Sequence, residues 1–443
     1  MQSFFPRPSE RALALTLGFI LFVNYLAMGV TKVVAVSGFL GQVRDHYILL
    51  VWIVDMILLI IASGAQSYFI DRINRVRLLK IVLVAFSLLY LLLGLTFLWK
   101  AFPLTLSYTL IYLLNDQQWR FFPVLFWILA NDVYPPAQGK RLIPFIGNFA
   151  FLGTLTGLGI ATLDAYIHVG AMRLLLLNAS FFFLAFLFAR KRLDALNIPT
   201  SASKTPTLAE TFKDSLEFIR TVPTFGYLTL GMLFTGIIMS ILLYESIYSA
   251  RSTLGGDFQA FYAQYNLAIV LASLGMQFFS VRLVERMETR KGFLIQPVTM
   301  IAGVALSLFF PHFLAIALGH GIARVTYETV DLSFRKAVQS IVPNEKRGRV
   351  SMFIDSYLPS LGTIVGSVIA FVIITIGLEI GWERLLASRI YLGFAMLIGF
   401  GGLWTGLKVY RSYADSLLNW KLKRRSRAAD LLSDIDFSER TKE

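Results

Sequence analysis

Long apolar stretches follow one another along the chain and are separated by short polar segments. Each holds roughly 20 residues, the length that a helix needs to cross the hydrocarbon core of a bilayer. In the first half they occupy residues 12–39, 47–70, 78–99, 103–130, 142–163 and 171–189. In the second half they occupy residues 225–244, 261–279, 293–310, 313–333, 350–376 and 390–409. Because these runs are continuous and do not alternate, they predict an all-α membrane protein with twelve transmembrane helices, six plus six, in place of spanning strands.

The polar segments divide the chain into four expected regions. We predict an N-terminal six-helix bundle at residues 1–189, a cytoplasmic linker at 190–224, a C-terminal six-helix bundle at 225–411 and a basic cytoplasmic tail at 412–443. The linker contains IPTSASKTP, a composition typical of a flexible connection. Within it, Thr207 and Glu210 have the spacing of a capping box, and apolar residues follow at helical spacing, which predicts a short amphipathic helix.

The two halves repeat a phrase, LGTLTG at 152–157 and LGTIVG at 361–366. The preceding loops correspond as well, YPPAQGKR ending at Arg141 and VPNEKRGR ending at Arg349, which indicates an internal duplication. In each copy two glycines stand four residues apart, on one face of a helix, where they allow another backbone to approach closely. The glycines predicted to serve helix packing are Gly153, Gly157, Gly362 and Gly366.

The composition supports a membrane protein. Hydrophobic residues make up 56% of the chain and charged residues 15%, more apolar surface than a soluble core of this length buries. The net charge of +14 does not indicate a nucleic-acid partner, because most of the 41 Lys and Arg residues fall in segments that are cytoplasmic if both termini are. We therefore expect a multi-pass protein of a bacterial inner membrane with cytoplasmic termini.

Enzyme and metal chemistry have little support. The chain has no cysteine, its four histidines are widely spaced, and the common hydrolase, metalloprotease and phosphate-loop motifs are missing from the sequence. We expect neither catalytic residues, a metal site nor a cofactor. The expected partners are a small-molecule substrate and the lipid bilayer, and the chain is expected to be a monomer.

The arrangement of six plus six spans, inside termini and a long central loop resembles the major facilitator superfamily of secondary transporters. The loop after the second span, SYFIDRINRVR, is similar to the family signature GxxxDRxGRR but has Ser67 and Asn74 at the glycine positions. The resemblance implies transport by alternating access, with this loop holding the two halves together in one conformation. The charged residues assigned to gating are Asp71, Arg72, Arg75, Arg77, Arg141 and Arg349.

A narrower resemblance covers about a tenth of the chain. The segment LFWILANDVYPPAQGKRLIPFIGNFAFLGTLTG looks like the region between the fourth and fifth spans of the nucleotide translocases, the ATP/ADP antiporters within the facilitator superfamily. The residues that carry it are Phe126, Trp127, Ala130, Asn131, Lys140, Arg141, Pro144 and the later glycines. This resemblance implies nucleotide exchange.

Ionisable residues within the apolar stretches are costly, so each is a candidate for function. The cations Lys32, Arg120 and Arg324 are expected to bind an anionic substrate, since arginine binds phosphate or carboxylate in bidentate fashion. The carboxylates expected to carry a proton or to pair with a cation are Asp55, Asp116, Glu245, Glu328 and Asp331. Further candidates for substrate contact are Asn24, Tyr25 and Trp119.

The spacing of these charges leaves two interpretations open. Asp116 and Arg120 are four residues apart, as are Arg324 and Glu328, so each pair shares a helix face and can neutralise itself locally. In the alternative, the cations are free for substrate. The duplication places Asp116 in register with Arg324, with the charges reversed, and Lys32 has no partner on its own helix.

Three functions follow from these observations. The first is a secondary active transporter that moves a small anionic metabolite, with a nucleotide-like compound as the favoured substrate. The second is an efflux transporter of the same fold for drugs or lipids, against which the three intramembrane cations weigh. The third is a membrane scaffold or sensor that transports nothing.

Overall fold

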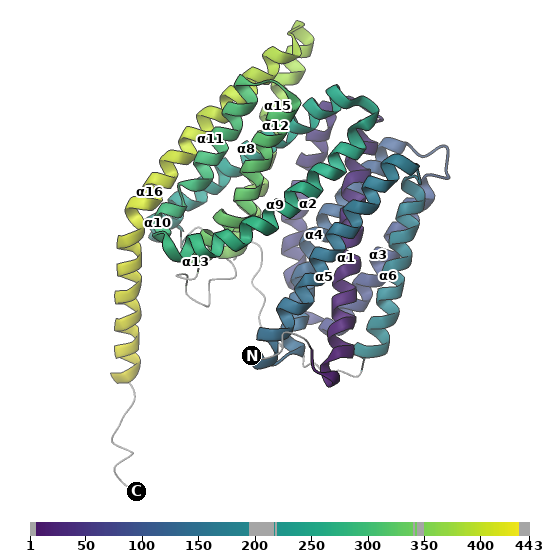
Figure 1. Ribbon diagram of the computed structural model, residues 1–443. Helices are drawn as coiled ribbons and strands as arrows, with labels where there is room; N and C mark the ends of the chain where they lie inside the picture. The colour runs from purple at the N-terminus through teal and green to yellow at the C-terminus, as the bar shows by residue number, and fades with distance from the viewer. Residues whose placement is uncertain (1–5, 195–216, 218, 340–341, 343–349, 434–443) are drawn as a thin grey trace.

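The structure is a computed structural model that describes residues 6–194, 217, 219–339, 342 and 350–433, and all regular structure in these ranges is helical (Figure 1). The first half contains six long helices and a short 3₁₀ turn, η1, at Asp45–Tyr47. The long helices are α1 (Pro8–Leu40), α2 (Ile48–Arg72), α3 (Arg75–Thr96), α4 (Leu104–Val133), α5 (Pro136–Ile167) and α6 (Ala171–Leu193).

The second half is also helical but less regular. It begins with α8 (Pro223–Leu254), a 3₁₀ turn η2 (Gly255–Asp257), α9 (Phe258–Arg286), the single turn α10 (Thr289–Gly292) and α11 (Ile295–Phe309). It continues with α12 (Phe313–Thr326), η3 (Tyr327–Asp331), α13 (Leu332–Gln339), η4 (Phe353–Tyr357), α15 (Leu358–Ile380) and α16 (Arg384–Ser433). Both η3 and η4 are π-helical turns, a wider winding that often occurs near functional sites.

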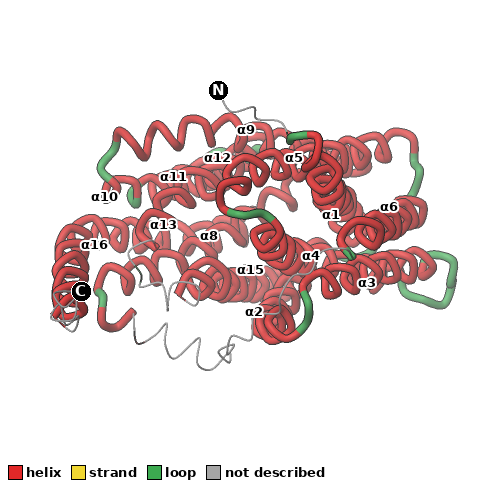
Figure 2. Tube along the Cα trace, turned by 90° about the horizontal axis from the view of Figure 1, so that it is seen from below, coloured by secondary structure: helices red, strands yellow, loops and turns green. Residues whose placement is uncertain are grey.

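The helices form two bundles that lie side by side, α1 to α6 in one and α8 to α16 in the other (Figures 1 and 2). Where the bundles meet, α5 packs on α9 and α2 packs on α15. We call the end of the molecule at which α1 begins and α16 ends the lower end, and the opposite end, where α1 ends and α2 begins, the upper end. The four predicted regions stay a prediction, and most of the predicted linker helix lies outside the described residues.

The repeated glycines lie where two helices of the same bundle approach most closely. A Cβ atom at Gly153 would stand 2.4 Å from the carbonyl oxygen of Phe22 on α1, and one at Gly157 would stand 2.3 Å from that of Leu26. In the other bundle a Cβ at Gly362 would stand 2.4 Å from the carbonyl oxygen of Leu233 on α8. A Cβ at Gly366 would stand 2.2 Å from Ser240 Oγ and 2.6 Å from the carbonyl oxygen of Ile237, both on α8. The two copies thus occupy equivalent contacts, α5 against α1 and α15 against α8.

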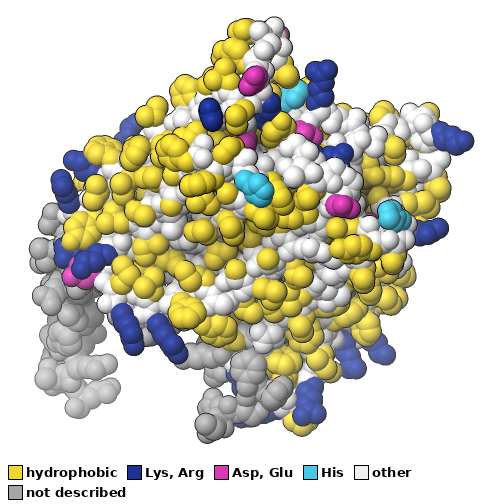
Figure 3. Space-filling model, turned by 45° about the horizontal axis from the view of Figure 1, so that its top comes forward, with side chains coloured by type: hydrophobic (Ala, Val, Ile, Leu, Met, Phe, Trp, Pro, Cys, Tyr) yellow, Lys and Arg dark blue, Asp and Glu magenta, His cyan; other side chains and the backbone are white. Residues whose placement is uncertain are grey.

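The surface is that of an integral membrane protein. Large apolar side chains are strongly exposed around the bundle, for example Phe278 at 72% and Phe309 at 71%, and Figure 3 shows hydrophobic side chains over most of the visible face. Such a surface fits lipid and not water. Nine stretches among the described residues are long and apolar enough to cross a membrane. One of these contains both α8 and α9, whereas α4 and α12 are outside the nine, so the count of twelve spans stays a prediction.

Candidate functional site

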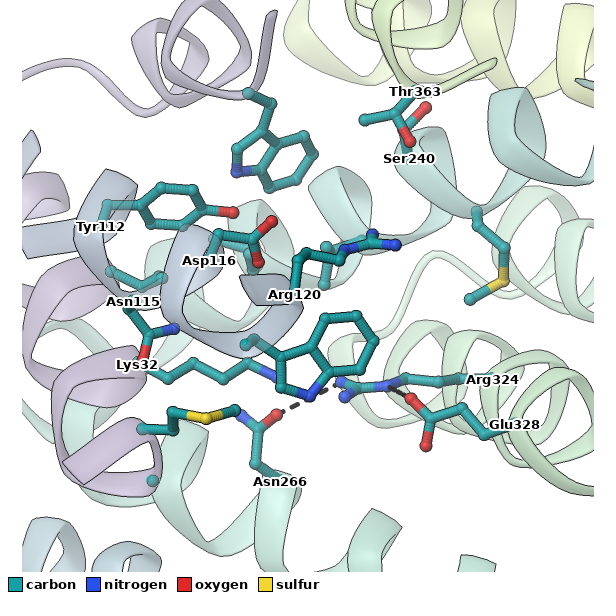
Figure 4. A pocket seen from close by; sticks show the side chains of 18 of the residues that line it. Lys32, Tyr112, Asn115, Asp116, Arg120, Ser240, Asn266, Arg324, Glu328 and Thr363 are labelled. Atoms are coloured by element: carbon teal, nitrogen blue, oxygen red, sulfur yellow. Dashed lines mark hydrogen bonds and ion pairs between the residues drawn. The ribbon is translucent and has the colours of Figure 1, made fainter. Parts of the chain in front are cut away.

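A cavity of about 450 Å³ lies between the two bundles. Its walls come from α1, α2, α4 and α5 on one side and from α8, α9, α12, η3 and α15 on the other. Both bundles therefore contribute to the cavity. Its volume is in the range typical of small-molecule sites. The labelled side chains of Figure 4, all of which line this cavity, are Lys32, Tyr112, Asn115, Asp116, Arg120, Ser240, Asn266, Arg324, Glu328 and Thr363.

On the side of the second bundle, the cation of the cavity is already paired. Arg324 donates from Nε to Glu328 Oε1 at 2.8 Å, one helical turn further along, and from Nη1 to Asn266 Oδ1 on α9 at 3.3 Å. The local pairing that the spacing of four allows is therefore present here. It neutralises the charge of Arg324 but leaves part of its guanidinium facing the cavity (Figure 4).

On the side of the first bundle the equivalent pairing is missing from the described residues. The guanidinium of Arg120 lies over the ring of its neighbour Trp119, 4.7 Å from the centroid, and its Nε is buried without a hydrogen-bond partner. Lys32 also lines the cavity, and no salt bridge or hydrogen bond joins it to another described residue. Two of the three predicted cations thus have no carboxylate of their own within the described structure.

The spacing along the chain allows Asp116 to pair with Arg120, but in the structure Asp116 lies beside Asp55. Its carboxyl group is within hydrogen-bonding range of that of Asp55, which reaches it from α2. Asp55 is fully buried and accepts a hydrogen bond from Gln117 Nε2 to its Oδ1 at 3.2 Å. Its other oxygen, Oδ2, is buried and receives no donor among the described residues. The site therefore contains a carboxyl pair as well as its cations.

The remaining wall of the cavity is mostly apolar and aromatic. Tyr25 and Trp119, both predicted to contact substrate, lie in it together with Trp52. Methionine side chains from three helices complete this part, and they adapt their shape easily to a ligand. These are Met28, Met56 and Met239. The cavity thus combines charged groups with an apolar surface.

Several predicted residues lie outside the lining of the cavity. Asn24 is buried within the first bundle, where its side-chain oxygen accepts from Gln118 Nε2 at 2.9 Å. Glu245 faces α16 and accepts hydrogen bonds from the hydroxyl groups of Tyr391 and Ser388. Both side chains satisfy buried polar groups within one bundle, which is a sufficient reason for their presence there.

Asp331 also turns away from the cavity. It accepts from Arg335 Nε at 2.6 Å, and the same guanidinium donates from Nη1 to Asp355 at 2.5 Å. The π-helical turn η3 ends at Asp331, and its wider winding changes the face on which the following residues lie. Arg335, which the sequence analysis did not single out, is therefore the centre of a buried ion cluster between α13 and η4.

The residues assigned to gating are only partly described. Arg75 forms an ion pair with Asp132 at the end of α4, and Arg141 donates from Nη2 to both carboxylate oxygens of Glu10, at 2.7 and 2.6 Å. Arg77 is exposed. The side chains of Asp71 and Arg72, and the whole of Arg349, lie outside the described residues.

Sequence reasoning missed the small polar residues of the second bundle that line the cavity. Their signal was present, since each interrupts an apolar stretch, but single Ser, Thr and Asn residues are common in membrane helices. The missed residues are Ser240, Asn266, Ser360 and Thr363. His320 was missed as well, and its Nδ1 lies 2.6 Å from the hydroxyl of Tyr265.

No protein-family model and no curated protein matches this chain. Solved structures do match. A mutant of the nucleoside transporter NupG aligns with 89% of this chain and 99% of its own, at 12% identity and a TM-score of 0.69. A bacterial homologue of the human lysosomal transporter Spinster, in an inward-facing and unoccupied conformation, covers 94% and 99% at 15% identity and a TM-score of 0.60. A mutant of the peptide transporter POT covers 93% and 97% at 12% identity and a TM-score of 0.62. From this likeness over nearly the full length we conclude that the chain has the major facilitator fold.

Proposed function

We propose that this protein is a secondary active transporter that moves a small anionic metabolite across the membrane by alternating access. The observation that carries the proposal is the cavity between the bundles, into which Lys32 and Arg120 project without a carboxylate partner among the described residues. An unpaired cation within the membrane-spanning region is costly, and an anionic ligand lowers that cost. Arg324, which also donates to Glu328 and Asn266, is the third residue that we expect to bind the anion.

The contacts between the bundles support alternating access. Gln259 Nε2 on α9 donates to Asp164 Oδ2 on α5 at 2.7 Å, and Gln264 Nε2 donates to the hydroxyl of Tyr166 at 3.1 Å. These hydrogen bonds lie at the upper end, where α5 ends and α9 begins. With both termini in the cytoplasm of a bacterium, as we propose, these hydrogen bonds join the bundles at the outer end, and we propose that the cavity is reached from the cytoplasm.

A nucleotide-like compound is the substrate class that we favour. Phosphate groups fit the cations, and a base fits an aromatic wall in which Trp119 already stacks on a guanidinium. One structural neighbour is named as a nucleoside transporter. Because it is only 12% identical to this chain, the likeness shows the fold and not the substrate. A drug or lipid efflux transporter requires mainly the apolar part of the cavity, so the unpaired cations favour the anion. We further propose that the protein acts as a monomer and that the loop after α2 takes part in gating.

The test is exchange of labelled ATP and ADP by proteoliposomes that contain unlabelled nucleotide. We expect saturable exchange in the wild type and at least about a tenfold loss in Lys32→Gln, Arg120→Gln and Arg324→Gln, because a hydrogen bond to a charged group contributes roughly 1.5–3 kcal/mol. Arg173→Gln, at an exposed arginine of α6 outside the cavity, is the matched control and is expected to exchange normally.

Two results would contradict parts of this proposal. Wild-type protein that exchanges no nucleotide, but takes up another anion from a panel of phosphorylated and carboxylated compounds, would remove the nucleotide and keep the transporter. Transport at the wild-type rate in all three Gln variants would show that the cations do not bind the substrate.

A further inference from the structure

Among the described residues, Asp55 has the one buried carboxylate oxygen without a hydrogen-bond donor. It lies on α2 with no exposed surface, and α4 and α15 pack against this helix. Its Oδ1 accepts from Gln117, but Oδ2 has no donor among the described residues. Buried carboxylate oxygens normally accept hydrogen bonds, so an unpartnered one requires an explanation. The neighbouring group that can supply the missing hydrogen bond is the carboxyl of Asp116, provided that the pair holds a proton.

The other intramembrane carboxylates already have donors. Glu328 accepts from Arg324, Asp331 accepts from Arg335, and Glu245 accepts from two hydroxyl groups. Among the carboxylates that the sequence singled out, Asp55 and Asp116 have neither a bonded cation nor a hydroxyl donor within the described structure. Two carboxylates in contact repel each other strongly when both are ionised, and a shared proton removes this repulsion.

The charged groups that surround the pair come from both bundles. The cationic groups are Lys32 on α1, Arg120 on α4 and Arg324 on α12. The other titratable groups are Tyr25 on α1, Tyr112 on α4, Tyr262 on α9, His320 on α12 and Glu328 on η3, whereas α15 contributes only neutral residues to the lining. With both aspartates and Glu328 ionised, three negative charges oppose three positive ones. An arriving anion then makes the cavity negative, and one proton on the aspartate pair offsets one of its charges.

We propose that Asp55 and Asp116 hold one proton between them and that this proton moves together with the anionic substrate, so that the protein is a proton–anion symporter. This inference rests on the proposed transport function and adds its coupling ion. In each cycle the pair takes the proton from the side on which the anion binds and releases it to water on the other side. The proton raises the affinity of the cavity for the anion, and the anion raises the affinity of the pair for the proton, since such coupling is reciprocal.

The first experiment detects the proton without any substrate. Infrared difference spectra of the purified full-length protein are recorded in neutral and alkaline buffer. We expect the C=O band of a protonated carboxyl group in neutral buffer, abolished by Asp55→Asn and equally by Asp116→Asn. Asp55→Glu is expected to restore it, and Asp257→Asn, at an exposed carboxylate of η2, is expected to leave it unchanged. A band that persists in either Asn variant, or that is missing from the wild type, would overturn the proposal.

The second experiment measures coupling as net uptake of labelled ADP into proteoliposomes that contain no nucleotide, with the membrane potential held at zero. For one proton per anion, an inwardly directed gradient of one pH unit is expected to support about tenfold accumulation, which Asp116→Asn abolishes. ADP uptake by the wild type that does not depend on the pH gradient would overturn the proposed coupling between proton and anion. If the wild type takes up no ADP at all, the nucleotide substrate is wrong, and the infrared experiment still decides whether the pair holds a proton.

Discussion

Replacing Gly157 by alanine tests whether close backbone approach between α1 and α5 holds the first bundle together. The added Cβ would stand 2.3 Å from the carbonyl oxygen of Leu26 and 3.1 Å from the Cα of Gly29. Both are backbone atoms, so no side chain can rotate away. Ordinary contact begins at 3.4 Å, and the helices must therefore separate locally by about 1 Å, which disturbs the packing along the whole α1–α5 interface.

The magnitude can be isolated with a control on the same helix. Gly159→Ala adds the same methyl group at a position with no neighbouring atom within 4 Å. Both substitutions gain the same intrinsic helix preference, up to about 1 kcal/mol, which cancels in their difference. What remains is the cost of overpacking, typically about 1–3 kcal/mol. Gly157→Ala should therefore have a lower free energy of unfolding than Gly159→Ala by this amount.

The assay is unfolding of the purified protein by SDS, followed by circular dichroism, with midpoint and slope measured for each variant. Gly362→Ala is the equivalent test in the second bundle, where the new Cβ would stand 2.4 Å from the carbonyl oxygen of Leu233. Equal stability of Gly157→Ala and Gly159→Ala would refute the reasoning, because the backbone approach would then not limit stability.

Two further predictions concern contacts outside the cavity. Asp164→Ala removes the acceptor of Gln259 at the upper end, and the loss of a charged hydrogen bond of roughly 1.5–3 kcal/mol should shift the population toward opening at that end by about tenfold or more. The measurement is the rate at which a membrane-impermeant maleimide labels a Val36→Cys reporter in the cavity, since the chain has no native cysteine. We expect faster labelling in Asp164→Ala, and an unchanged rate would contradict the prediction. Arg335→Gln leaves the buried Asp331 without its cation and should destabilise the protein by about 3–5 kcal/mol in the SDS assay, whereas a loss below about 1 kcal/mol would show that the cluster is not truly buried.

The helices were predictable because lipid imposes a simple rule on the sequence. A stretch of about 20 apolar residues has few alternatives to a spanning helix, and the predicted runs 12–39 and 103–130 coincide closely with α1 and α4. The close-packing role of Gly153 and Gly157 was expected for a similar reason, since two glycines on one helix face leave a groove that another backbone can fill. These features depend on the sequence of one helix alone.

The partners of the charged side chains depend on how each helix is rotated against its neighbours, which one sequence does not contain. A spacing of four permits an ion pair but does not enforce it. Arg324 and Glu328 pair, whereas Asp116 lies beside Asp55 and leaves Arg120 to stack on an aromatic ring. The π-helical turn had no signal in the sequence either, and Asp331, which was expected near the cavity, ends this turn and accepts from Arg335 instead.

The duplication thus preserves packing and changes chemistry. The glycines occupy equivalent contacts in both bundles because both must bring two backbones together in the same way. The charges at equivalent positions of α4 and of the α12–η3 segment are reversed. The second bundle carries a neutralised pair, and the first carries a guanidinium unpaired within the described structure beside two carboxyl groups. Arg120 and Lys32 can therefore bind an anion from the side of the first bundle, whereas Arg324 shares its charge with Glu328. The proposed binding of an anion and its accompanying proton therefore rests on this asymmetry within a symmetric framework.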